Sequence, residues 1–176
     1  MERSKALILS ATAELLILEG PAGINVDAIA RQSGVARTTV YRHFHDLDQL
    51  VALAIRFVDE PTDPPLTADP VSDVATIAAA FAHELEFTEF GHLQAALAEM
   101  ASRTELLTEL QLELLRSRKR QLRSAIRRAC TAESLDRDPV LLADQILAML
   151  WYRHLVSHES LSQRAVRHYV ETLFGR

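Results

Sequence analysis

The sequence predicts an all-α fold, and three observations favour it. Aromatic residues make up 6% and apolar residues 48% of the 176 residues, so a core would be built mainly from Leu, Ala, Ile and Val, which suit helices. Apolar residues recur at helical spacing along most of the chain, whereas no alternation typical of a strand is long enough to compete. Four of the six prolines lie in residues 59–72, where no helix can continue.

The first two predicted helices each have a clear start or stop signal. Residues 4–19 place apolar side chains on one face, and Gly20 followed by Pro21 ends that helix. Asn25 can cap a short helix over residues 26–33, because its side-chain oxygen can accept a hydrogen bond from a free backbone N–H of the first turn. We therefore expect two amphipathic helices near the N-terminus.

A tight turn at Gly34 is expected to join this short helix to the next one, because glycine supplies the positive φ that such a turn requires. In the helix predicted over residues 37–44, Val40 and Phe44 lie four residues apart and face the core, which leaves the polar residues on the outer surface. Residues 46–58 form the fourth predicted helix, which begins with a capping-box pattern.

Helical patterns resume beyond the proline-rich segment and continue along the rest of the sequence. They cover residues 71–90, 92–102, 104–131, 139–158 and 161–174. Ser160 is expected to cap the last of them. The sequence therefore predicts two domains and a linker, which comprise residues 1–58, 73–176 and 59–72, respectively.

The net charge of −5 argues against a general binder of polyanions, but one segment is locally basic. Residues 28–45 contain three arginines, two histidines and no acidic residue. The predicted helices over residues 26–33 and 37–44 have, with the turn between them, the dimensions of a helix-turn-helix, whose second helix enters the major groove of DNA. The residues expected to contact DNA are Asn25, Arg37, Thr38, Thr39, Tyr41, Arg42 and His43.

The stretch of residues 29–44, which reads IARQSGVARTTVYRHF, resembles the DNA-binding signature of TetR-type regulators. The helices predicted before and after it fit the same family. The resemblance implies that three N-terminal helices bind DNA, that the fourth relays a signal, that the last two pair two subunits, and that the middle holds a ligand pocket. It therefore implies a ligand-responsive regulator, with a repressor favoured, which binds palindromic double-stranded operator DNA as a homodimer and is released by an unknown small molecule.

Two positions depart from the family pattern. Ala36 stands where a small hydroxyl residue usually caps the recognition helix, which removes a cap worth about 1 kcal/mol. Leu47 stands where a lysine usually contacts a phosphate. We therefore expect a modest affinity for DNA, while the buried positions that define the motif are unchanged.

Large apolar side chains of the C-terminal part are candidates for an apolar ligand pocket, and they are Phe81, Phe87, Phe90, Met100 and Trp151. Each of them would equally suit an ordinary core. The last two predicted helices are apolar on more than one face, so we expect a second copy of the chain to cover one face, although a core within one subunit is the alternative. The expected interface residues are Leu150, Val166, Tyr169 and Val170.

Other classes of function lack their motifs. The sequence has no phosphate-binding loop, nucleophile elbow or metal motif, so we expect no enzyme, no cofactor and no bound metal. No stretch is apolar enough to cross a bilayer or to serve as a secretory signal, so the cytoplasm is the expected location. The basic residues crowded into 116–128 would suit a second nucleic-acid patch, but we favour a surface that faces solvent or the acidic segment 84–113. The rival function is a dimeric helical binding or interaction protein without specific DNA binding.

Overall fold

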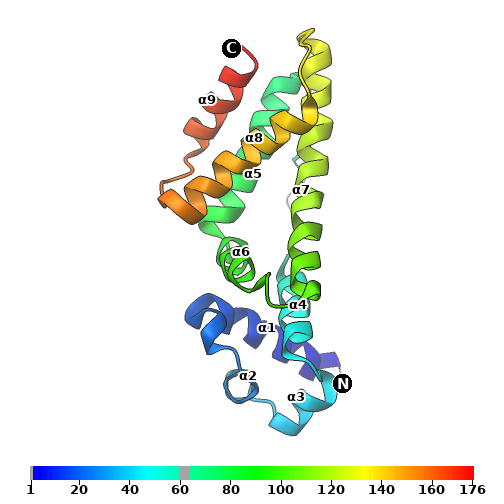
Figure 1. Ribbon diagram of the computed structural model, residues 1–176, viewed down its shortest axis with the longest axis vertical. Coiled ribbons are helices and arrows are strands. Elements are labelled where there is room, and N and C mark those ends of the chain that lie inside the picture. Colours follow the sequence, from blue (N-terminus) through cyan, green and yellow to red (C-terminus); the bar gives the residue numbers. More distant parts are fainter. Residues whose placement is uncertain (1, 60–63) are drawn as a thin grey trace. The chain divides into compact units, whose positions relative to one another are not determined.

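The computed structural model describes residues 2–59 and 64–176, and the α-helices there confirm the all-α prediction (Figure 1). In chain order the helices are α1 (Glu2–Glu19), α2 (Val26–Ser33), α3 (Arg37–His43), α4 (Leu47–Val58), α5 (Pro70–Phe87), α6 (Glu89–Met100), α7 (Glu105–Ala132), α8 (Pro139–Tyr152) and α9 (Gln163–Leu173). A 3₁₀ turn, η1 (Pro21–Gly23), follows α1, and a π-helical turn, η2 (Arg153–Ser157), follows α8.

Contacts along the chain define two compact units. Unit 1 comprises Met1–Glu60 and Glu89–Glu113, and unit 2 comprises Pro61–Thr88 and Leu114–Arg176. The helix α6 and the first turns of α7 therefore pack with the N-terminal helices, although they follow α5 in the sequence. The predicted division at the proline-rich segment stays a prediction.

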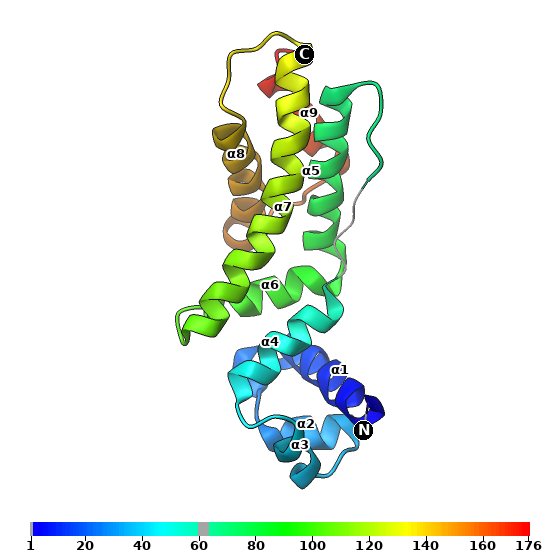
Figure 2. The same cartoon turned by 90° about the vertical axis from the view of Figure 1, so that its right-hand side faces the viewer.

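Unit 1 is built around α1 and α4, which lie between α6 on one side and the α2–α3 pair on the other (Figures 1 and 2). The apolar faces of α1 and α4 supply the largest fully buried side chains, including Ile8, Leu16, Leu50 and Ile55. Burial of such a side chain stabilises the fold by roughly 1.5–3 kcal/mol. This core fixes the position from which α2 and α3 extend.

Unit 2 is a bundle of α5, α8, α9 and the part of α7 from Leu114 onward (Figure 2). The helix α9 packs along α5, where Val166 and Val170 are buried. Leu122 of α7 and Leu150 of α8 are also buried in this unit. The core is therefore made mainly of aliphatic side chains, as the low aromatic content predicts, with Phe81 and Phe174 also buried in it.

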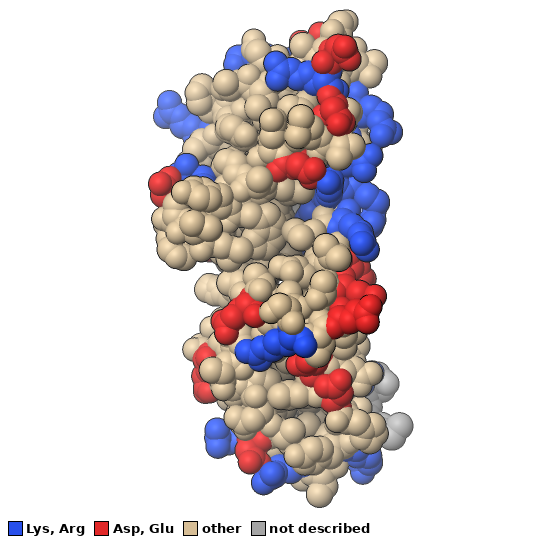
Figure 3. Space-filling view, in the orientation of Figure 1, with Lys and Arg blue, Asp and Glu red and all other residues tan. Residues whose placement is uncertain are grey.

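Basic side chains gather along the part of α7 in unit 2 (Figure 3). Two that face the bundle have acidic partners on other helices: Lys119 pairs with Asp144 of α8 at 2.6 Å, and Arg118 pairs with Glu84 of α5 at 3.3 Å. Others, which include Arg116, Arg120 and Arg127, are exposed.

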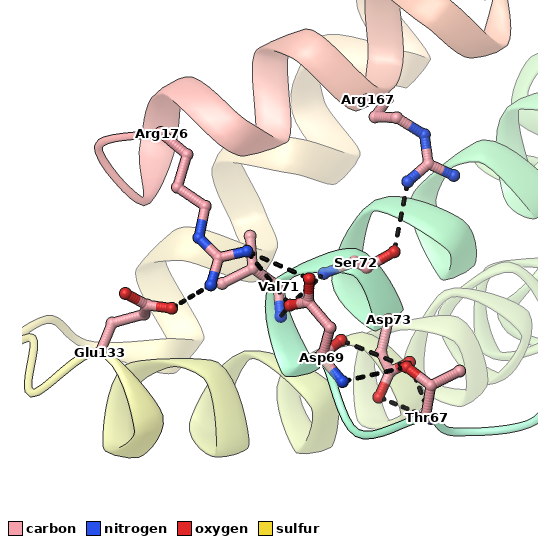
Figure 4. A network of polar contacts seen from close by, with 8 residues as sticks. All are labelled: Thr67, Asp69, Val71, Ser72, Asp73, Glu133, Arg167 and Arg176. Atoms are coloured by element: carbon pink, nitrogen blue, oxygen red, sulfur yellow. Dashed lines mark hydrogen bonds and ion pairs between the residues drawn. The ribbon is translucent and has the colours of Figure 1, made fainter.

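A polar network holds the start of α5 in place (Figure 4). The Asp69 carboxylate caps α5 by accepting hydrogen bonds from the backbone N–H groups of Val71 and Ser72, and it also accepts one from Arg176. The Ser72 N–H bond and the Arg176 guanidinium hold the pKa of Asp69 below its ordinary value, against a partial desolvation. Arg176 also pairs with Glu133 beside the end of α7. The network therefore ties the end of the chain to both α5 and α7.

Most helix ends lie within two residues of their predicted positions. The exceptions are the boundary between α5 and α6, which lies three residues earlier than expected, and the end of α8 at Tyr152, where η2 follows in place of a helix continued to residue 158. Two further differences concern the linker and the cap of α9. The linker predicted over residues 59–72 ends earlier than expected, because α5 begins at Pro70, and its residues 60–63 lie outside the described part. The cap of α9 is Ser162, whose hydroxyl accepts a hydrogen bond from the Ala165 N–H, so the prediction of Ser160 as the cap was wrong by one half-turn. Both Ser160 and Ser162 offer the same hydroxyl, and only the path of the chain distinguishes them.

Candidate nucleic-acid interface and effector site

The α2–turn–α3 segment is held by local backbone contacts. Asn25 caps α2, because its Oδ1 accepts a hydrogen bond from the Ala28 N–H at 2.9 Å. Gly34 ends α2 with φ of 67°, a left-handed conformation that favours glycine. The hydroxyl of Ser33 then accepts a hydrogen bond from the Val35 N–H at 3.3 Å. These contacts set α3 at its angle to α2.

Two apolar side chains fix the face that α3 presents. Val40 is 1% and Phe44 5% exposed, so both face the core of unit 1 as expected from their spacing. The opposite face is polar and open to solvent. Of the residues predicted to contact DNA, Arg37, Thr38, Tyr41 and Arg42 are exposed, whereas Thr39 and His43 are half-buried. The seventh, Asn25, lies at the start of α2 with its side-chain oxygen engaged in the cap.

An ion pair that sequence reasoning missed crosses from α2 to α3. The Nε of Arg37 lies 2.6 Å from Oδ1 of Asp27, and both side chains are more than half exposed. Asp27 lies just before the basic segment in the sequence, so the segment was described as free of acid. Only the packing of α2 against α3 brings the carboxylate to the recognition surface.

The residues predicted to form a ligand pocket do not all come together. Phe81 and Trp151 pack edge to face, with ring centres 6.1 Å apart, in unit 2. Phe87 is 67% exposed, and His83 lies beside its ring. The other two, Phe90 and Met100, are buried in unit 1. Only the pair Phe81 and Trp151 is therefore a shared cluster.

A small cavity lies beside this aromatic pair. Its walls come from α5, α7 and α8, and it is lined by Ile77, Ala78, Phe81, Arg118, Gln121, Leu122, Leu147 and Leu150. It measures about 10 Å³, which is room for about one water molecule. Arg118 is 6% exposed, pairs with Glu84, and lies over the Phe81 ring with its guanidinium carbon 5.9 Å from the ring centre.

The apolar residues predicted at a subunit interface are mostly inside unit 2. Leu150, Val166 and Val170 are at most 1% exposed in a single chain, whereas Tyr169 is half-buried. A side chain that contacts a second subunit must be exposed before association, so the first three hold α8 and α9 within one subunit instead. Burial also raises the pKa of the Tyr169 phenol.

Both the N-terminal and the C-terminal part of the chain match a protein-family model. Residues 8–54 match the model described as bacterial regulatory proteins, tetR family, and residues 64–173 match the model described as tetracyclin repressor-like, C-terminal domain. The chain belongs to the TetR family. Sequence comparison with curated proteins gives no match.

Solved TetR-family structures share the fold over nearly the whole chain. A TetR family transcription regulator is 26% identical, with a TM-score of 0.67, and the match covers 98% of this chain and 97% of that one. A TetR transcription regulator from Haloarcula marismortui is 15% identical, with a TM-score of 0.76 and coverage of 99% and 98%. AibR, crystallised in complex with isovaleryl coenzyme A and operator DNA, is 21% identical, with a TM-score of 0.69 and coverage of 98% of each chain.

The two departures from the TetR pattern have structural counterparts. Ala36 occupies the N-cap of α3, and no side chain there accepts a hydrogen bond from the first turn. Leu47 begins α4, which is instead capped by Asp46 through a hydrogen bond from the Asp48 N–H.

Across the described residues, no His, Cys, Asp and Glu side chains form a group of three that could hold a metal. No described helix combines the length and the apolar character needed to cross a membrane.

Proposed function

We propose that this protein is a transcriptional repressor that binds palindromic operator DNA as a homodimer in the cytoplasm and is released by a small molecule. The observation that carries the proposal is the geometry of α3. Its buried Val40 and Phe44 direct Arg37, Tyr41 and Arg42 outward on a helix of the size that a major groove admits.

The test is selection of DNA by the protein itself from a pool of randomised duplexes, followed by anisotropy titration of the enriched sequence. We expect a palindrome whose half-sites lie about one helical turn apart, and an affinity that falls steeply with salt. Arg42→Ala should weaken binding about tenfold, while Arg127→Ala, which removes an exposed arginine of unit 2, should not. No enrichment, or equal effects of the two changes, would refute the proposal.

The homodimer is supported by an unpartnered apolar face on α8 and η2. Leu141, Tyr152 and Val156 are 57%, 60% and 63% exposed. Their spacing of eleven and four residues places them on one side of the helix. Exposed apolar side chains in one row are typical of a surface that a second copy covers. The proposed interface therefore differs from the buried positions that sequence periodicity suggested.

The response to a small molecule is supported by unit 2. Its cluster of Phe81, Trp151 and Arg118 combines aromatic and charged groups beside a small apolar cavity, a mixture of groups that ligand sites use. At about 10 Å³ the cavity would have to widen to admit a ligand. AibR, which has a similar fold, was crystallised in complex with isovaleryl coenzyme A and operator DNA.

One observation favours the rival function of a dimeric helical binding protein without specific DNA binding. Asp27 neutralises Arg37 on the surface that would meet DNA, in a chain of net charge −5. The two functions differ in the selection experiment, because the rival predicts that no duplex sequence is enriched even at low salt.

A further inference from the structure

Trp151 lies between two hollow places in unit 2. On one side its ring contacts Phe81, which lines the small cavity, at 6.1 Å between ring centres. On the other side it contacts the His154 ring at 6.4 Å, and His154 lines a second, larger hollow. This hollow measures about 350 Å³, and its lining residues are Glu86, Arg153, His154, His158, Glu159, Ser160 and Leu161. The Phe81 and Trp151 rings therefore lie between the surface hollow and the small cavity.

Two buried hydrogen-bonding groups in this part of unit 2 have no partner among the described residues. Both Nε1 of Trp151 and Oγ of Ser157 are buried and have no hydrogen-bond partner among the described residues. A buried donor left unpaired costs roughly 1–3 kcal/mol. Trp151 lies in the last turn of α8, and Ser157 ends η2, whose π-helical turn is a rare form found frequently at functional sites. The indole N–H can only donate, so it calls for an acceptor.

The charges around the hollow limit which acceptor fits. Arg153 is neutralised by Glu159 at 2.9 Å, and Glu86 adds a further carboxylate, which accepts a hydrogen bond from the Leu161 N–H. Arg153, Glu86 and Glu159 together give this lining a net negative formal charge. A carboxylate ligand would be repelled there, whereas an ammonium ligand has no lone pair for the indole N–H.

The charged side chains beside the small cavity have no net charge. Arg118 and Glu84 form a buried pair whose charges cancel. A ligand group that brings a net charge into this space would be desolvated without a counterion, at a cost of several kcal/mol. The remaining walls, which include Ile77, Leu122 and Leu147, favour an aliphatic group.

We propose that the effector of this protein is a small uncharged molecule with an aliphatic part and a hydrogen-bond-accepting oxygen, such as a ketone, ester or lactone. It enters at the hollow beside η2, its oxygen accepts the hydrogen bond of Trp151 Nε1, and its aliphatic part occupies the cavity once the Phe81 and Trp151 rings separate. This inference rests on the proposed ligand response and names the class of ligand.

The experiment compares three six-carbon probes, which are hexan-2-one, hexanoate and hexylammonium. Trp151 is the one tryptophan of the chain, so its fluorescence reports binding at this place directly. We expect saturable changes in emission with hexan-2-one, at an apparent Kd at least tenfold below those of both charged probes. Tighter binding of hexanoate or of hexylammonium, or no saturable response to hexan-2-one, would overturn the proposal.

A variant separates the hydrogen bond from packing. Trp151→Phe keeps an aromatic ring but removes the N–H, so calorimetric affinity for hexan-2-one should fall about tenfold, equivalent to about 1.4 kcal/mol. Ser124→Ala, which removes an exposed hydroxyl of unit 2, should bind as the parent does. Equal affinity of Trp151→Phe and the parent would refute the role of the N–H, and the probe comparison on the unaltered chain does not depend on how either variant folds.

Operator binding is measured separately on the same preparation. Loss of DNA selection would refute the proposed function even where hexan-2-one binds, and normal DNA binding with no response of Trp151 would refute only the effector class.

Discussion

Replacing Asp27 by Asn should strengthen operator binding, which is an unusual expectation for a change on a DNA-binding surface. The Asp27 carboxylate lies 2.6 Å from Arg37 Nε, on the exposed side of α3. A phosphate must compete with that carboxylate for the same guanidinium. The Asp27→Asn change keeps the size of the side chain and removes its charge, so Arg37 would be free to contact DNA.

The size of the expected gain in DNA affinity follows from how exposed the Asp27–Arg37 ion pair is. The Arg37 and Asp27 side chains are 60% and 56% exposed, and an ion pair between such groups contributes about 0–1 kcal/mol. Release of Arg37 therefore raises the affinity by up to about fivefold for each half-site. One added phosphate contact in each half-site should also steepen the dependence of the logarithm of affinity on the logarithm of salt concentration by about 0.9 for each half-site.

The assay is anisotropy titration of the selected duplex at several salt concentrations with four proteins, namely the parent, Asp27→Asn, Arg37→Ala and the double variant. The gain should vanish in the Arg37→Ala background, because there is then no guanidinium to release. Glu99→Gln is the matched control, since it removes the charge of another exposed, arginine-paired carboxylate of unit 1. Unchanged or weaker binding of Asp27→Asn, or an equal gain without Arg37, would refute the reasoning.

Three further predictions concern stability and assembly. Asp73→Ala should lower the free energy of unfolding by about 2–3 kcal/mol in chemical denaturation, because the buried carboxylate accepts hydrogen bonds from Thr67 and Arg128. The Thr67 hydroxyl, and after it the Thr67 N–H and Arg128, hold the pKa of Asp73 below its ordinary value, against desolvation. This stabilisation is therefore present above about pH 4 and is lost as the pH falls through the lowered pKa, and the variant should lack that part of the parent's acid sensitivity. Tyr152→Asp should convert dimers to monomers in light scattering, with an unchanged circular-dichroism spectrum. Arg118→Met should lower the thermal midpoint strongly, since Glu84 would be left buried without its partner at a cost of about 3–5 kcal/mol, whereas an unaffected midpoint would show that the pair contributes nothing.

The helix-turn-helix could be predicted from the sequence because its signals are local. Asn25 as a cap, Gly34 in a left-handed turn, and the spacing of Val40 and Phe44 each act within a few residues. The structure confirms all of them. The pair formed by Asp27 and Arg37 could not be predicted in this way, because it depends on the angle between two helices.

Periodicity alone could not show which subunit covers an apolar face. Leu150 and Val166 are apolar at helical spacing, and so are Leu141 and Val156, but the first two are buried in one chain and the last two are exposed. A sequence pattern shows that a side chain needs cover and does not show what provides it. Val166 is buried within one chain because α9 packs against α5, which lies far from it in the sequence.

The basic residues of α7 are neighbours in the sequence, but in the helix they point in different directions. Successive residues point in different directions, so Arg118 and Lys119 face α5 and α8 and pair with Glu84 and Asp144, while Arg120 is exposed. The acidic partners come from two helices and only one of them lies in the acidic segment 84–113. The interpretation of two facing blocks is therefore too coarse. Each basic residue is balanced, or left to solvent, according to its own direction on the helix.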